Sequence, residues 1–146
     1  MSKQFVNIEV DRASAKALQS SMKQYGRRAI KAITDGIKRT ALAIETDAKR
    51  RLNGQLGSAK HWITGRLAAS VHTEMEGLNS FDAVAESKQK DSNLQETVSD
   101  MEGIVGTNVE YADKIEFDYD SFLRFAAERQ SRKFSKRVEQ ELNKIK

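Results

Sequence analysis

The sequence contains no cysteine. Its absence excludes disulfides, thiolate-bound zinc, iron–sulfur clusters and a cysteine nucleophile together. The chain also lacks any stretch that approaches the roughly 18 apolar residues of a membrane-spanning helix. Residues 1–10 have no apolar segment of the kind found in secretory signals. We therefore expect no membrane partner and no export by the general secretory route.

Apolar residues are few and charged residues are many. The 146 residues are 38% hydrophobic and 32% charged, which is low and high, respectively, for a globular protein. A chain of this length is typical of one domain, so we expect a single domain over residues 1–146. The composition indicates a thin core, a mobile segment, or a surface that partners complete.

The charges are segregated along the chain. Lys and Arg minus Asp and Glu give a net charge of +9 for residues 1–71, −10 for residues 72–120 and +5 for residues 121–146. Such segregation predicts surfaces of opposite potential that guide association with a second copy or a charged partner. The simpler interpretation, that helices carry cations on their solvated faces, stays open.

Two stretches repeat apolar residues every three or four positions, as one face of an amphipathic helix does. The first predicts a long helix over about residues 14–52, which Gly26 and Gly36 each weaken by about 1 kcal/mol relative to alanine. A break near Gly26 is compatible with this pattern, and Asn53-Gly54 is typical of a helix stop. The second stretch predicts a C-terminal helix over about residues 121–145.

Between the helices, alternating apolar and polar residues predict a small antiparallel sheet over about residues 66–117. Its clearest strand is Leu67–Met75, with His72 and Glu74 on the wet face. Further strands are expected at residues 5–10, 81–86 and 97–107, with a turn at 77–80 and a short strand or turn at 111–117. Three side chains are expected in the core: Trp62, Leu67 and Val71.

The segment 87–96 is the most polar of the chain, with one apolar residue in ten. We expect it to form a mobile arm, because it buries too little to offset its ordering entropy. Taken together, the elements predict an α+β fold with two long amphipathic helices packed on a small antiparallel β-sheet.

No pattern indicates catalysis, a metal site or a cofactor site. His61 and His72 are the only histidines, and both are expected to be exposed. Residues 54–60 lack the Gly-Lys-Ser/Thr ending of a phosphate-binding loop and follow a helix rather than a strand. Carboxylates crowd residues 100–120 without the apolar lining that would separate their pKa values, so we expect a solvated acidic surface and no enzyme.

Basic residues on both helices offer nonspecific phosphate binding or contact with the acidic segment of a neighbouring copy. No aromatic or amide side chains are placed among them to read bases, so any DNA contact would be nonspecific. We favour the protein contact, because the acidic middle of the chain offers the basic faces a partner. The subunit-interface candidates are Glu110, Asp113 and Glu116 on the acidic side and Arg129, Arg132 and Arg137 on the basic side.

A set of short motifs lies between and around the helices: Gly65, Arg66, Leu67, Ser70, Val105, Gly106, Tyr111, Ala112, Glu116, Phe117, Phe122 and Leu123. In order and rough spacing this set resembles the tail-component family of long-tailed bacteriophages, small neck or tail-completion proteins that help to join a DNA-filled head to a tail. The resemblance covers about residues 15–146. It implies that Gly65 to Ser70 opens a strand, and that Arg66, Tyr111 and Glu116 tie sheet to helix or subunit to subunit.

The resemblance also implies a function. The protein would be a virion structural protein of the head–tail joining region, a ring-forming adaptor without catalysis. Its partners would be further copies of itself and other neck or tail proteins, with DNA only as nonspecific cargo in a channel. It would reside in the virion, and in the host cytoplasm during assembly. The alternative is a nonspecific nucleic-acid-binding module.

Overall fold

The computed structural model describes residues 6–9, 26–56, 65–82, 88–94, 98, 101–119 and 121–144. Four antiparallel strands form one sheet in the order β1-β4-β2-β3. Their bounds are Val6–Glu9 for β1, His72–Met75 for β2, Leu78–Asn79 for β3 and Ile104–Thr107 for β4. Val105 of β4 pairs with Ile8 of β1 and with Thr73 of β2.

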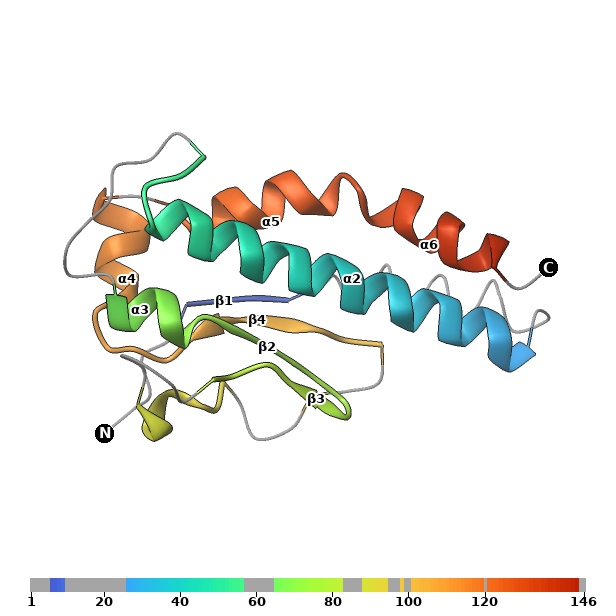
Figure 1. Ribbon diagram of the computed structural model, residues 1–146, viewed down its shortest axis with the longest axis horizontal. Helices are drawn as coiled ribbons and strands as arrows, with labels where there is room; N and C mark the ends of the chain where they lie inside the picture. Colours follow the sequence, from blue (N-terminus) through green and yellow to red (C-terminus); the bar gives the residue numbers. More distant parts are fainter. Residues whose placement is uncertain are drawn as a thin grey trace.

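Helices make up most of the remaining described chain. They are α2 (Gly26–Leu52), α3 (Gly65–Ser70), α4 (Ala112–Lys114), α5 (Leu123–Ser131) and α6 (Phe134–Asn143), with a 3₁₀ turn η3 (Gln89–Asp91) and a π-helical turn η4 (Ile115–Tyr119). The helices α2, α5 and α6 lie on one side of the sheet, and η3 lies on the other side (Figure 1). The predicted α+β class is therefore confirmed.

The two ends of α2 follow the local chemistry of the sequence. Gly26, the first residue of α2, has a φ of 77°, a left-handed value outside the helical range. Residues 11–25, where the predicted helix would begin, lie outside the described residues. At the other end Gly54 has a φ of 83°, and the N–H of Gln55 donates to the carbonyl of Arg50 at 2.9 Å. This is a Schellman ending, so the predicted stop at Asn53-Gly54 is confirmed.

The core has two parts along α2. One joins α2 to α3, β4, α4 and α5 and contains the buried Leu67 and Val71, as predicted. The other joins the first half of α2 to α6 and includes Ile33, Ile37 and Val138. Trp62, the third predicted core residue, lies outside the described residues.

Gly36 sets the distance between α2 and α6. A Cβ atom at this position would lie 2.6 Å from Val138 Cγ2, far inside van der Waals contact. The residue that weakens α2 in isolation therefore permits the close approach of α6. This is a packing reason for a glycine inside a helix.

The predicted strand Leu67–Met75 is wrong for its first half, because Gly65–Ser70 forms α3 and only His72–Met75 forms a strand. Leu67 and Val71 are both buried, and the Val71 N–H donates to the Leu67 carbonyl at 3.2 Å. Apolar residues four apart fit a helical face as well as they fit strand alternation. The helix is favoured because it buries both side chains against α2.

Three other predicted elements also need correction. Residues 111–117 are helical, in α4 and η4, instead of a strand or turn. The strand predicted at 97–107 is confined to β4 in the described residues, and the turn at 77–80 moves to Glu76-Gly77 with β3 directly after it. The C-terminal helix is two helices, interrupted at Arg132-Lys133. Of the strand predicted at 81–86, residues 83–86 lie outside the described residues.

In the segment 87–96, predicted as a mobile arm, the described Lys88, Gln89, Lys90 and Asn93 are exposed, whereas two side chains pack inwards. The side chains of Asp91 and Leu94 are buried, and the N–H of Leu94 donates to Glu74 Oε2 at 2.6 Å. Asn108 also donates to the carbonyls of Lys90 and Asn93. One apolar residue is enough here because polar contacts hold the rest of the segment.

Candidate interface around the start of helix α5

The motif residues converge at one end of the molecule. Leu67, Val105, Ala112, Phe122 and Leu123 are all buried in one apolar cluster, against which Tyr111 packs. The hydroxyls of Ser70 and Thr107 lie 2.6 Å apart and join α3 to β4. Residues that are far apart in the sequence therefore form one structural unit around the start of α5.

Glu116 caps helix α5 from a distance in the sequence. Its carboxylate accepts hydrogen bonds from the backbone N–H groups of Phe122, Leu123 and Arg124 at 2.8–2.9 Å, and from the Ser121 hydroxyl at 3.0 Å. These N–H groups have no partner within the helix, and a negative charge is favourable there. Glu116 is 5% exposed. Within its own chain the Glu116 carboxylate therefore ties η4 to the start of α5, where the resemblance implied a tie of sheet to helix or of subunit to subunit.

Phe117, the next residue, has the opposite environment. It is 74% exposed and is the one exposed large hydrophobic side chain in the described ranges. The π-helical turn η4 directs Ile115 and Glu116 inwards and leaves Phe117 in solvent. Nothing in the sequence pattern separated the two members of this Glu-Phe pair, since both belong to the same motif.

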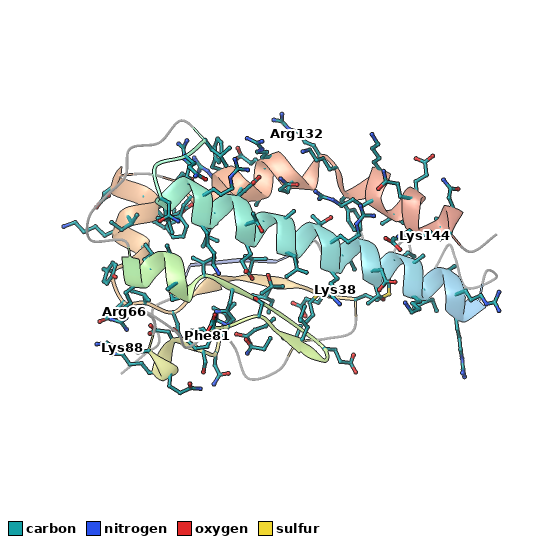
Figure 2. All side chains as sticks on the ribbon, viewed as in Figure 1. Lys38, Arg66, Phe81, Lys88, Arg132 and Lys144 are labelled. Atoms are coloured by element: carbon teal, nitrogen blue, oxygen red, sulfur yellow. The ribbon has the colours of Figure 1, made fainter. Side chains whose placement is uncertain are left out.

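Arg66 clamps η3 to α3. Its Nε and Nη2 atoms donate to the two carboxylate oxygens of Asp91 at 3.0 and 2.8 Å, and its Nη1 donates to Glu110 at 3.3 Å. Burial by itself would raise the Asp91 pKa, but the bonds from Arg66 and from the Lys88 N–H bring it below its ordinary value. Figure 2 shows Arg66 and Lys88 on the same side of the molecule as η3. Arg66 thus ties elements of one chain together.

Three further residues that the sequence singled out, Glu110, Tyr111 and Asp113, follow in the chain after β4. Glu110 is exposed, and its pKa is lowered by the bond from its own backbone N–H and then by Arg66. Burial raises the pKa of the Tyr111 hydroxyl. Asp113 is exposed on α4.

A second buried polar pair lies on the sheet face that residues 88–94 cover. His72 is fully buried, its Nε2 lies 2.6 Å from Glu74 Oε2, and its Nδ1 lies 2.8 Å from the Ser70 carbonyl. The edge of the Phe81 ring closes the site at 5.3 Å between centroids. The predicted exposure of His72 is wrong, because the covering segment could not be seen in strand alternation. His61 lies outside the described residues.

Both side chains of this pair are buried, and Glu74 Oε2 also accepts the Leu94 N–H. Both ring nitrogens face oxygen atoms, those of the Ser70 carbonyl and the Glu74 carboxylate. Within the described residues, no group of three or more His, Asp or Glu side chains is arranged to hold a metal ion. The arrangement stabilises the covering segment.

Two of the three basic interface candidates bind within their own chain. Arg137 donates to Gln130 Oε1 at 2.5 Å and to Thr40 Oγ1 at 3.2 Å, and Gln130 in turn donates to the buried Asp47 at 2.6 Å. Burial, followed by the charge of Arg39, lowers the Arg137 pKa. The side chain of Arg129 is 44% exposed, and its Nε lies 3.3 Å from Asp47 Oδ2. This network holds α5 and α6 on α2 at the interruption between them.

Arg132 is the basic candidate that projects freely. It points away from the sheet at the interruption between α5 and α6 (Figure 2). Lys133 and Lys136 are also exposed on this stretch. These three side chains form the exposed basic ridge.

Comparison of the chain with protein-family models, curated proteins and solved structures finds no match. In the described part of the chain, no helix has both the length and the apolar content needed to cross a bilayer. The contacts described above are therefore the basis for a proposed function.

Proposed function

We propose that the protein is a structural component of the head–tail joining region of a long-tailed bacteriophage, a ring-forming adaptor without catalysis. The observation that carries the proposal is the convergence of the motif residues on the start of α5. Leu67, Val105, Ala112, Phe122 and Leu123 share one buried cluster, and Glu116 caps the helix beside them. Motif residues from separate segments of the sequence therefore pack in one buried cluster.

Phe117 gives this unit an outward-facing contact. A structural adaptor acts by presenting surfaces, and an aromatic ring left in water loses about 1.5–3 kcal/mol of burial that a partner can restore. The buried ionisable groups of the unit already have partners: Glu116 at the helix start and Asp91 at Arg66. This arrangement supports a role in assembly over one in catalysis.

Deletion of the gene from the phage or prophage genome that carries it tests the proposal. We expect lysates that contain filled heads and separate tails by electron microscopy, with joined particles restored by the unmodified gene supplied on a plasmid. A deletion that leaves joined, infectious particles at the parental titre would contradict it.

The exposed basic ridge favours the second candidate, nonspecific nucleic-acid binding. Arg132, Lys133 and Lys136 are cations that can neutralise phosphates. If this is the function, affinity for duplex DNA falls by orders of magnitude between about 50 and 200 mM salt and drops further when the three residues are changed to Glu. A variant with all three changes that joins heads to tails normally would exclude this function as the essential one.

A further inference from the structure

The helices α2, α5 and α6 carry a large excess of exposed positive charge. Over residues 26–52 and 121–144, twelve Lys and Arg side chains are exposed, against two exposed carboxylates, Glu128 and Glu139. The other described residues show the opposite balance, with five exposed carboxylates and three exposed lysines. The side of the molecule that these helices form is therefore positively charged, and it offers a surface to a polyanion.

Three arginines of α2 form a straight row. Arg28, Arg39 and Arg50 are eleven residues apart, and eleven residues make about three helical turns, so the three side chains share one stripe of the helix. At about 1.5 Å per residue the row is about 33 Å long. Arg39 donates to Gln140 and Glu141 at 3.1 and 3.0 Å, which places the row beside α6.

This row lies on the side of α2 that faces away from the sheet. A Cβ atom at Gly103, directly before β4, would lie 3.3 Å from side-chain atoms of both Ile37 and Ala41. Arg39 is two residues from each of them, and side chains two residues apart on an α-helix point about 200° apart. Arg39 therefore points away from the sheet, and the row is open to a molecule that approaches the helices from outside.

A second row of cations runs alongside on α5 and α6. These helices are antiparallel to α2, because Gln130 bonds to Asp47 and, further along the chain, Arg137 bonds to Thr40. The exposed basic ridge lies on this second row, and Arg132 points away from the sheet (Figure 2). The two rows together form the basic face, which consists of Arg28, Arg39, Arg50, Arg132, Lys133 and Lys136.

We propose that the basic face binds the phosphate backbone of duplex DNA, without reading its bases. Duplex DNA carries about one negative charge per 1.7 Å of its axis and completes a turn in about 34 Å, close to the length of the row on α2. Within the described residues, no ion pair neutralises Arg28, Arg50 or Arg132, so their charges are available to phosphates. The inference rests on the proposed function, because it assigns the helix side of each copy to the DNA channel of the ring.

The distribution of charge favours DNA over a neighbouring copy as the partner. The chain's own exposed carboxylates are scattered: Glu76 lies at the β2–β3 turn, whereas Asp113 and Asp118 lie on α4 and η4, at the other end of the strands (Figure 1). Exposed lysines lie among them, such as Lys114 on α4. A duplex matches the whole length of the basic face with negative charge, whereas a copy of this chain would meet it with a few separated carboxylates.

DNA affinity of the full-length protein across a salt series tests the inference. The probe is a fluorescein-labelled duplex of about 20 base pairs, two helical turns, followed by fluorescence anisotropy. Arg28→Glu with Arg50→Glu should weaken binding at least about tenfold at about 50 mM salt. The slope of log affinity against log salt should become shallower by about 2, since two phosphate contacts are lost. Arg28→Lys with Arg50→Lys keeps both charges and should bind within about twofold of the unmodified protein.

The matched control reverses two exposed lysines outside the basic face. Lys88→Glu with Lys114→Glu should leave DNA affinity within about twofold of the unmodified value, and urea melts of every variant should match that of the unmodified protein. An equal loss of affinity in this control would overturn the inference in favour of attraction by net charge alone. The absence of DNA binding by the unmodified protein at about 50 mM salt would also overturn it.

Two further measurements separate DNA from other acidic partners. If the Arg28→Glu, Arg50→Glu variant loses self-association in sedimentation without DNA while its DNA affinity is unchanged, the face binds a neighbouring copy and the inference is wrong. Tighter binding to vesicles of equal parts phosphatidylcholine and phosphatidylserine than to DNA would reject it in favour of a bilayer. Because gene deletion tests the proposed function separately, a protein that fails to bind DNA but whose deletion leaves heads and tails unjoined would reject only this contact.

Discussion

At the scale of single residues, the neighbouring Glu116 and Phe117 differ in role. Glu116 stabilises the fold, and Phe117 is the residue we propose for association. Glu116 Oε2 accepts the N–H groups of Phe122 and Leu123, while Oε1 accepts the Ser121 hydroxyl and the Arg124 N–H. Phe117 contributes a ring that stays in solvent. Substitution of the first should therefore affect folding, and substitution of the second should affect assembly.

Glu116→Ala should lower the free energy of unfolding by about 1–2 kcal/mol, because four donors at the start of α5 lose their acceptor. Glu116→Gln should recover little of this, since its NH₂ group would face N–H groups in place of one oxygen. Urea melts followed by circular dichroism measure the effect. Asp118→Asn, exposed on the same turn, is the control and should change stability by less than about 0.5 kcal/mol. Equal stability of all three variants would mean that the cap is unimportant.

Asp91→Asn should destabilise the protein in a pH-dependent manner. The pKa of Asp91 in the folded chain lies below its ordinary value of 3.8, so its ion pair with Arg66 contributes fully above about pH 5. The contribution is lost as pH falls through 3.8 towards the folded-state pKa. We expect the variant to be less stable by about 3 kcal/mol at pH 7, with the difference shrinking below pH 4.

Urea melts of both proteins between pH 3 and 7 measure this difference. Glu110, whose pKa is also lowered, is present in both proteins and so largely cancels in the comparison. A difference that stays constant over the whole range would show that Asp91 acts by packing instead of charge.

At the scale of elements, local signals succeeded where one segment determined its own structure. The Schellman ending of α2 follows from glycine at a left-handed φ value at position 54. The helix α3 was missed because six residues are too few for helical and strand periods to be told apart. The interruption between α5 and α6 was missed because Gln130 bonds to Asp47, 83 residues earlier.

Gly36→Ala tests an element contact that helix propensity alone would misjudge. In a free helix this change gains about 1 kcal/mol. Here the added Cβ meets Val138 Cγ2, and valine is stiff at χ1, so we expect a loss of about 1–3 kcal/mol. In a Val138→Ala background the same change should be neutral or stabilising. The double-mutant cycle, measured by urea melts, would refute the close approach if the two effects simply added.

At the scale of the whole molecule, the charge pattern predicted more free surface charge than the fold leaves. Arg66 is paired with Asp91, Arg137 donates to Gln130, and Glu116 accepts hydrogen bonds from the start of α5. Sequence segregation could not show these pairings, because they depend on segments brought together only by folding.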